Sequence, residues 1–380
     1  MRILFVTHSA FLPEVKRGQE RNTDQLCKAL QARGHQPAVI AGLISSGLVG
    51  KWASLRLKVG NRLRPVLDHF AGYPIYRTWD VDAAFDAVLD DFAPDVVVVQ
   101  SWVRSAAHCL ERKIPAVYYV HAANEPVDPI NETVRRDTLW LTVSQFAAMH
   151  NGSAHDLTFH IVPPLVEAPL YRVAHHERKY VTFIGLQNFK GGELAVKLAA
   201  ACPEIPFQIF DNVDRNLPQW PGMSGEELRA AAEKLPNVTI RPPVKGADAI
   251  YGATKVLLAP SRYQEAWGRV ASEAQINGIP VLASYRGGLP EAVGPGGVVL
   301  DYDAPIEVWA SHLQAMWNDE AYYASLSEKA LAHAARSEFQ PDTIINRFVD
   351  LIEARANGII VPAPRVTLPE VAAAAEAMRA

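Results

Sequence analysis

The sequence predicts an α/β protein built from two doubly wound domains. Its 380 residues exceed what one ordinary hydrophobic core organises. Short apolar runs alternate with helical patterns along the chain, and this rhythm breaks near residues 163–178. Runs that are apolar on both faces are typical of strands buried in a parallel sheet, and their alternation with helices indicates βαβ units.

The elements follow one another in a regular order. The predicted strands are the apolar runs at 2–8, 95–101, 116–122, 139–144, 180–185, 207–211, 238–241, 255–261, 280–284 and 297–301. The predicted helices lie at 20–33, 81–92, 134–137, 191–201, 226–234, 269–277, 321–335 and 342–355. Ligands of such sheets bind outside the carboxyl ends of the strands, so functional residues are expected in the loops that follow them.

The break in the rhythm predicts the domain boundary. Pro163, Pro164 and Pro169 stiffen the chain, and the charged stretch 175–179 follows before a new strand begins at Tyr180. The expected organisation is an N-terminal domain, a C-terminal domain, and a last helix with a tail. Their predicted ranges are 1–168, 169–340 and 341–380.

Composition excludes several classes of protein. Lys and Arg number 37 against 41 Asp and Glu, so the net charge is -4 and a globally basic nucleic-acid binder is not expected. The 3 cysteines lie far apart, without the spacing of a zinc site or a disulfide framework. The first apolar run is too short for a signal peptide, and nothing is long enough to span a membrane. We expect a cytoplasmic protein.

The most informative stretch is 260–274, which follows a predicted buried strand. Glu265 and Glu273 are separated by seven residues, and Gly268 stands where the next helix begins. Glycine lets the backbone approach a ligand, and the free N–H groups of a helix start favour an anion such as a diphosphate. Carboxylates are natural acceptors for sugar and ribose hydroxyls. The stretch therefore predicts a site for a phosphorylated sugar compound.

This stretch resembles the E-x7-E region of retaining GT-B glycosyltransferases of family 4. The segments 278–284 and 287–291 that follow it fit the same pattern. The resemblance implies a GT-B fold, with two Rossmann-like domains facing across a cleft and the nucleotide-sugar donor held by the C-terminal one. It also implies that the last helix, at 342–355, is a crossover helix that returns to the first domain. It also implies transfer of a hexosyl group from a nucleotide diphosphate sugar with retention of configuration, in glycan, polysaccharide or glycolipid biosynthesis. The acceptor, a sugar, glycan or lipid-linked compound, is not identified, and no metal or other cofactor is expected.

The resemblance also assigns site residues one by one. Glu265, His121 and Lys190 are the expected catalytic set: Glu265 would bind the sugar hydroxyls, His121 would line the sugar pocket, and Lys190 would meet the diphosphate. Glu273 would hold the ribose. The other expected donor-binding residues are Gly18, Gly185, Arg241, Arg262, Ala266, Trp267, Gly268 and Arg269.

One departure from the family pattern concerns Leu186. The family has Gly-Arg before its Lys-Gly, whereas here Leu186 follows Gly185. One of the two cations on the leaving group is therefore missing, and Arg262 or Arg269 is the candidate replacement. This departure keeps open the alternative of a non-catalytic subunit that binds nucleotide sugar. A second alternative also stays open: a GT-B relative with different chemistry, such as an epimerase or an inverting transferase.

Two Asp-x-Asp pairs imitate a metal motif. Asp80 and Asp82 stand at one predicted helix start, and Asp301 and Asp303 precede another. Acidic side chains at such places cap free N–H groups, and we interpret both pairs as caps.

Residues 48–66 have the pattern of an amphipathic helix with basic residues. At about 100° per residue one stripe holds Leu48, Trp52, Leu55, Val59, Leu63 and Val66. Five basic residues and no acid lie between Lys51 and Arg64. An interfacial helix on the inner face of an anionic membrane has this pattern. The favoured interpretation is a helix that packs its apolar face on its own domain, and the peripheral membrane contact stays open beside it.

Overall fold

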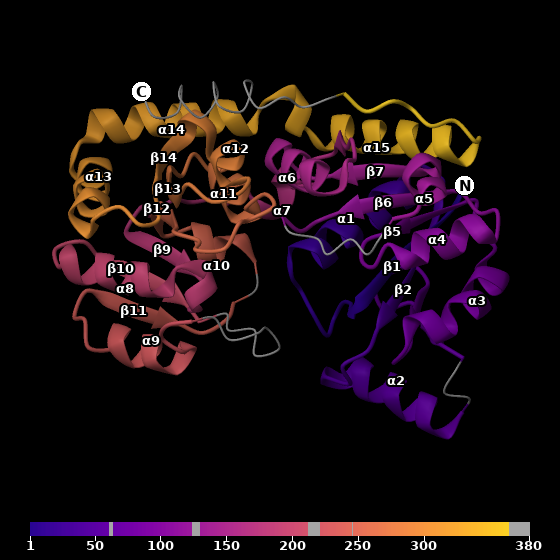
Figure 1. Cartoon of the computed structure of the whole chain (residues 1–380). Helices are drawn as coiled ribbons and strands as arrows, with labels where there is room; N and C mark the ends of the chain where they lie inside the picture. Colours follow the sequence, from indigo (N-terminus) through magenta and orange to yellow (C-terminus); the bar gives the residue numbers. More distant parts are fainter. Residues whose placement is uncertain (61–63, 124–129, 212–220, 245, 365–380) are drawn as a thin grey trace. The chain divides into compact units, whose positions relative to one another are not determined.

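The computed structural model describes residues 1–60, 64–123, 130–211, 221–244 and 246–364, which form two compact units. The first unit comprises Met1–Val143, Ala147–Leu165 and the stretch that begins at Pro341. The second unit comprises Ser144–Phe146 and Val166–Gln340. Each unit has its own sheet with helices packed on it (Figure 1).

The first unit is built on a sheet whose described strands run in the order β3-β4-β2-β1-β5-β6-β7-β8. All pairs are parallel except β3 with β4. The bounds are β1 (Arg2–Ala10), β2 (Gln36–Gly42), β3 (Val66–Asp68), β4 (Ile75–Arg77), β5 (Val96–Val99), β6 (Ala116–Val120), β7 (Thr138–Thr142) and β8 (His160–Ile161). The valines of β5 are fully buried, as strands covered on both faces require.

Helices cover this sheet, and one of them comes from the end of the chain. The helices of the first unit are α1 (Gly18–Ala32), α2 (Gly47–Val59), α3 (Val81–Phe92), α4 (Arg104–Glu111), α5 (Glu132–Asp137), α6 (Gln145–His155) and α15 (Pro341–Ala356). Phe348 of α15 stacks on Phe5 of β1 with ring centroids 6.2 Å apart. The first unit is thus formed by the first part of the chain together with α15.

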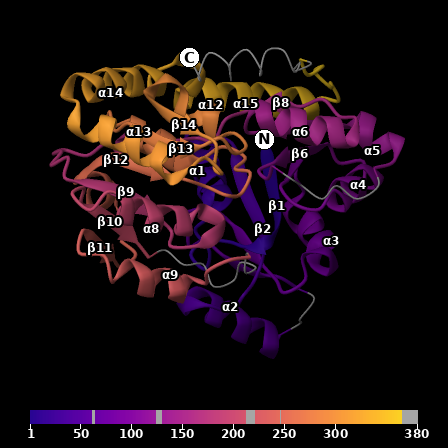
Figure 2. The same cartoon turned by 60° about the vertical axis from the view of Figure 1, so that its left-hand side comes forward.

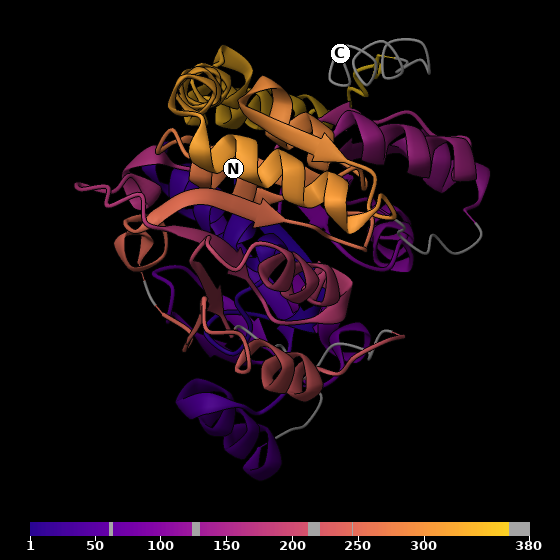
Figure 3. The same cartoon turned by 90° about the vertical axis from the view of Figure 1, so that its left-hand side faces the viewer.

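The second unit has a parallel sheet in the order β11-β10-β9-β12-β13-β14 (Figure 2). The strands are β9 (Tyr180–Ile184), β10 (Phe207–Phe210), β11 (Val238–Arg241), β12 (Thr254–Ala259), β13 (Val281–Ser284) and β14 (Gly297–Leu300). The α-helices are α7 (Ala168–Tyr171), α8 (Gly192–Ala201), α9 (Gly225–Ala232), α10 (Ala247–Tyr251), α11 (Arg269–Gln275), α12 (Leu289–Val293), α13 (Ile306–Asn318) and α14 (Glu320–Ala334). Short 3₁₀ turns are η1 (Asn188–Lys190), η2 (Gly294–Gly296) and η3 (Ser337–Phe339). Figure 3 shows α13 and α8 lying along this sheet.

Both sheets reverse their strand order once. In the first unit the chain leaves β1 for β2 on one side and later returns to β5 on the other. In the second unit the same reversal lies between β9 and β12. Ligands of open α/β sheets bind at the carboxyl ends of the strands at such a switch point. The topology therefore directs attention to the loops after β1, β5, β9 and β12.

The structure overturns the favoured interpretation of residues 48–66. Leu48, Trp52, Leu55 and Val59 of α2 are exposed rather than packed on the first unit. The buried residues of α2 are Gly50, Ala53, Ser54 and Leu57. Small side chains on the opposite face let the helix pack closely, so the larger apolar stripe faces away. Leu63 lies outside the described residues, and Val66 belongs to β3.

Candidate functional site

Lys190 and Glu265 meet at the switch point of the second unit. Lys190 ends η1 in the loop after β9, and Glu265 lies in the loop after β12. Lys190 Nζ is 2.5 Å from Glu265 Oε1, which also accepts a hydrogen bond of 2.9 Å from the Ser261 hydroxyl. The lysine side chain is 36% exposed and the glutamate 16%. The site therefore holds a cation and a hydroxyl acceptor side by side, at the rim of the sheet.

Glycine brings the two loops this close. Gly191 adopts φ +85°, and a Cβ there would lie 1.8 Å from the Pro260 carbonyl oxygen. The N–H groups of Arg262 and Tyr263 each donate to the Phe189 carbonyl at 3.0 Å. No residue with a side chain fits position 191 without moving a backbone. The Lys190-Gly191 pair thus fixes the lysine against the Glu265 loop.

A second pair of glycines supports Glu265 from the other side. The Gly288 N–H donates to the Glu265 carbonyl at 2.7 Å, and Gly287 forms an isolated parallel bridge with Glu265. A Cβ on Gly287 would lie 2.0 Å from that carbonyl oxygen. The sequence places 287–291 within the family pattern but does not indicate this supporting role.

Glu273 is held by Arg269, which the sequence analysis named, and by Tyr251, which it missed. The Tyr251 hydroxyl donates to Glu273 Oε2 at 2.7 Å, and Arg269 Nε lies 3.7 Å from Oε1. Arg269 also donates to the Tyr171 hydroxyl at 3.2 Å. Tyr251 and Tyr171 stand in short helices without a motif, so nothing in their sequence context indicates the contact. Arg269, one candidate for the missing cation, is thus bound to the acidic residue expected to hold the ribose.

The remaining expected donor residues are more scattered. Arg262 donates from Nη1 to the Pro221 carbonyl at 2.7 Å, and its backbone lies beside η1. Arg241 ends β11, and its guanidinium lies 6.0 Å from the ring centroid of Tyr180 at the start of β9. Among the described residues, Arg241 forms no hydrogen bond or ion pair with Lys190 or Glu265. These two arginines are not brought into the Lys190–Glu265 contact.

The loop that leads into α11 turns its large side chain inward. The Trp267 indole is buried, donates to the Ser272 hydroxyl at 2.9 Å and packs edge-on against Phe339. Gly268 has φ +103° and precedes α11. The Trp267 side chain is therefore turned into the protein, and its backbone remains to meet a ligand.

Leu186, the departure from the family pattern, is fully buried in the core of the second unit. Gly185 before it has φ +95°, and a Cβ there would lie 3.9 Å from Lys190 Cγ. The leucine side chain points away from the polar cluster into the apolar interior. An arginine at position 186 would have to leave that interior to reach an anion.

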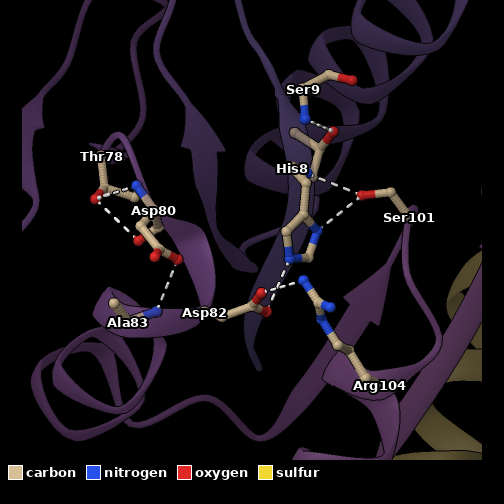
Figure 4. A network of polar contacts seen from close by, with 9 residues as sticks. His8, Ser9, Thr78, Asp80, Asp82, Ala83, Ser101 and Arg104 are labelled. Atoms are coloured by element: carbon tan, nitrogen blue, oxygen red, sulfur yellow. Dashed lines mark hydrogen bonds and ion pairs between the residues drawn. The ribbon is translucent and has the colours of Figure 1, made fainter.

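The first unit has its own polar cluster at its switch point (Figure 4). The His8 ring lies between the Ser101 hydroxyl, 3.1 Å from Nδ1, and the Asp82 carboxylate, 3.0 Å from Nε2. Arg104 forms an ion pair with the same carboxylate. Burial acts to raise the pKa of Asp82, and the hydrogen bonds from His8 and Arg104 outweigh it, so this pKa is lowered. In the neutral ring, Nε2 therefore donates to Asp82 and Nδ1 accepts from Ser101.

His121 and Gly18 lie at the same edge of this sheet. His121 follows β6, and its Nε2 is 3.1 Å from the Gln100 side-chain nitrogen. Gln100 follows β5 and accepts from the buried Thr23 hydroxyl of α1 at 2.9 Å. Gly18 begins α1, where the Gln19 side chain reaches Thr7 of β1 at 3.4 Å. His8, Ser101 and Trp102 are functional candidates that the sequence analysis did not single out.

The two Asp-x-Asp pairs have separate explanations. Asp80 caps α3 by accepting from the Ala83 N–H at 3.1 Å, so its interpretation as a cap is confirmed. Asp82 is not a cap, because it binds His8 and Arg104 instead. The interpretation of Asp301 and Asp303 as caps is wrong, because α13 begins after Pro305 without a side-chain cap. Asp303 pairs with Arg286 at 2.9 Å, and Asp301 accepts from the Asp303 N–H at 3.0 Å. Within the described ranges no three His, Cys, Asp or Glu side chains gather as a metal site.

Comparisons with known proteins agree with this architecture. The model for Glycosyltransferase Family 4 matches residues 16–160, and the model for Glycosyl transferases group 1 matches residues 174–333. The D-inositol 3-phosphate glycosyltransferase of Corynebacterium glutamicum is 32% identical over 217 residues, 49% of this chain and 50% of the relative. The enzyme of the same name from Salinispora tropica is 33% identical over 188 residues, 46% of this chain and 38% of the relative. The chain spans half or less of the length of these relatives.

Solved structures share the fold. Sucrose-phosphate synthase from Thermosynechococcus elongatus has a TM-score of 0.72 at 17% identity, covering 94% of this chain and 99% of that one. HepE of Anabaena in complex with UDP and glucose has a TM-score of 0.71 at 17% identity, covering 93% and 100%. The two Rossmann-like units define a protein of the GT-B class. Within that class the chain belongs to the glycosyltransferases of family 4, group 1.

Proposed function

We propose that the chain transfers a hexosyl group from a nucleotide diphosphate sugar to an acceptor hydroxyl, with retention of anomeric configuration, in the synthesis of a glycan, polysaccharide or glycolipid. The observation behind this proposal is the Lys190–Glu265 pair at the switch point of the second unit. A hexose diphosphate presents hydroxyls and an anion next to each other, which is the complement of a carboxylate beside an ammonium group. Among structural relatives, HepE is described in complex with UDP-glucose.

Each donor residue has a role in this proposal. Glu265 accepts hydrogen bonds from the sugar hydroxyls, and Lys190 stabilises the charge that develops on the leaving diphosphate together with amide groups near Gly268. Glu273, oriented by Tyr251, accepts from the ribose hydroxyls. Arg241 and Arg262 remain candidate contacts for the nucleotide, and the reaction so described needs no metal.

The acceptor is proposed to bind the first unit at the His8 cluster. His8, Ser101 and His121 end three neighbouring strands at the switch point, where ligands of such sheets bind. Trp102 beside them is 47% exposed and has φ +60°, a strained conformation of a kind that clusters at functional sites. His8→Ala is expected to raise the KM for the acceptor and leave nucleotide binding unchanged. An unchanged KM would remove His8 from the acceptor site.

The proposal includes the cellular location of the protein. Cys27, Cys109 and Cys202 are buried thiols, as suits a reducing compartment. Among the described residues no helix has both the length and the apolar character needed to cross a bilayer. We propose work in the cytoplasm with a peripheral contact to the inner face of the membrane through residues 48–66.

The first experiment is a thermal-shift screen against UDP, GDP, ADP, CMP and their common sugars. A nucleotide that binds the folded state raises Tm by mass action, and the nucleotide that does so names the base. Lys190→Ala should abolish the shift, whereas Lys197→Ala, on the exposed face of α8, should retain it. No shift with any nucleotide would contradict the proposed donor site.

Product analysis separates transfer from the alternatives. NMR of the product should show an anomeric configuration equal to that of the donor. An inverted product indicates an inverting transferase, and a free isomerised sugar nucleotide indicates an epimerase. Binding without turnover across an acceptor panel would favour a non-catalytic subunit.

A further inference from the structure

Helix α2 turns its apolar stripe away from the protein. Leu48, Trp52, Leu55 and Val59 are 89%, 40%, 62% and 81% exposed. At about 100° per residue these four positions fall within about 60° of one another around the helix axis. Single exposed apolar residues are ordinary on a protein surface, but four on one helical stripe are a contiguous patch.

The orientation of α2 is fixed by its opposite face. Gly50 packs on Glu14 so closely that a Cβ would lie 2.1 Å from Glu14 Oε1. The same carboxylate oxygen accepts from the Ser46 N–H at 2.8 Å, just before the helix begins. Ala53 and Leu57 are buried on this face. If α2 rotated about its axis to bury the stripe, a large side chain would take the place of Gly50 against Glu14. The packing of Gly50 on Glu14 therefore keeps the stripe facing outward.

Charge on α2 has one sign. Lys51, Arg56 and Lys58 are exposed, and α2 contains no acidic residue. On the helical wheel the two lysines flank one side of the stripe and Arg56 the other, with its guanidinium 5.8 Å from the Trp52 ring centroid. Long basic side chains beside an apolar stripe can extend to anionic headgroups while the stripe enters the acyl region.

We infer that α2 docks the protein in the plane of an anionic lipid surface, with the Leu48–Val59 stripe inserted and the basic residues on the headgroups. This deepens the proposed membrane contact and does not require the proposed donor chemistry. Charge complementarity selects lipid over a second copy of this helix, because two copies would bring like charges together. More apolar surface is available in the same unit, where Ile44, Leu67 and Phe70 are also exposed.

The experiment is co-sedimentation of the full chain with vesicles. Phosphatidylcholine vesicles with 30% phosphatidylglycerol, at about 50 mM salt, should pellet the protein; pure phosphatidylcholine should pellet at least tenfold less. Raising salt to about 0.5 M should weaken binding, since screening shortens the reach of the basic residues. Trp52→Glu with Leu55→Glu should abolish it.

Controls separate the stripe from general effects. Val308→Glu with Leu331→Glu changes two other exposed apolar residues, on α13 and α14, and should bind vesicles like the unchanged protein. The nucleotide thermal shift should be the same in all variants, so failure of the donor site and failure of α2 docking are read separately. Absence of pelleting on anionic vesicles, or equal pelleting of the Trp52/Leu55 variant, overturns the inference. Dimerisation in solution that the same variant abolishes also overturns it, in favour of a second copy.

Discussion

At the residue scale, Lys190 and Glu265 form an ion pair with each other. Their 2.5 Å contact means that a donor must replace an existing ion pair with its own diphosphate and hydroxyls. The family resemblance predicted both residues, but it could not predict their contact. That contact depends on Gly191 and Gly287 approaching backbone oxygens from segments far apart in the chain.

A substitution of Glu265 and a substitution of Lys190 should therefore have different effects on nucleotide affinity. Glu265→Gln leaves Lys190 without its ion pair, so affinity for the nucleotide diphosphate should be retained while turnover falls by about 10²-fold or more. Lys190→Ala should weaken nucleotide binding as well. Calorimetric titration with the nucleotide identified by thermal shift, together with kcat, tests this. Equal loss of nucleotide affinity in both variants would contradict the assigned roles.

Leu186→Arg should destabilise the protein rather than restore a family arginine. The side chain at 186 lies in the apolar core, and a buried charge without a partner costs about 3–5 kcal/mol. Tm should drop, whereas Gln187→Arg at the adjacent half-buried position should change it little. A normal Tm with increased turnover would show that position 186 can reach the leaving group.

His333 should make the second unit sensitive to acid. Burial, followed by the nearby Arg336 charge, lowers the pKa of His333 from 6.5 to about 4. Between pH 6.5 and 4 the unfolded chain binds a proton at His333 and the folded chain does not. The free energy of unfolding therefore decreases as pH falls from 6.5 toward 4. The difference is about 3 kcal/mol at most. His333→Gln should flatten the pH dependence of the unfolding midpoint over this range, and an unchanged slope would refute the assignment.

At the element scale, the loops after β9 and β12 pack directly on each other because Gly191 has no side chain to separate them. Most strands and most helices could be predicted from their apolar runs and helical patterns. The sequence analysis missed β2, and β3, β4 and β8 have too few residues for a period to appear. It also assigned the wrong outward face to α2, because hydrophobicity favours burial while the close fit of Gly50 on Glu14 is a tertiary effect.

Gly191→Ala tests the joint between the loops against a matched glycine. Gly191 and Gly34 have φ of +85° and +81°, so alanine strains the backbone similarly at both. At Gly191 the new Cβ meets a backbone oxygen, whereas at Gly34 no atom of the described residues lies within 4 Å of it. Gly191→Ala should therefore lower Tm further than Gly34→Ala and abolish the nucleotide-induced shift. Equal effects would mean that the loop approach is unimportant.

At the scale of the whole molecule, the first unit is closed by the far end of the chain. Ile344, Phe348 and Ile352 of α15 are buried in it, although the stretch Val166–Gln340 of the second unit intervenes. The family resemblance predicted this crossover helix, whereas its apolar periodicity alone could not say which sheet it covers.

Phe348→Ala should unfold the first unit more easily while sparing the second. Removing a fully buried phenylalanine costs about 3–5 kcal/mol. Calorimetry should show an earlier transition for the first unit and an unshifted nucleotide-stabilised transition for the second. Asp350→Ala, on the exposed side of the same helix, is the control and should stay within about 0.5 kcal/mol. A uniform shift of both transitions would mean that the units do not unfold separately.

The position of α15 has a consequence for biosynthesis. A ribosome releases residues 1–165 long before it has made Pro341–Ala356, so the first unit leaves the exit tunnel with Phe5 and its neighbours uncovered. The second unit, whose described strands and helices are contiguous apart from Ser144–Phe146, can finish first. The half of the protein that is translated first is thus the half that matures last, and in the interval its apolar sheet is a natural client for chaperones.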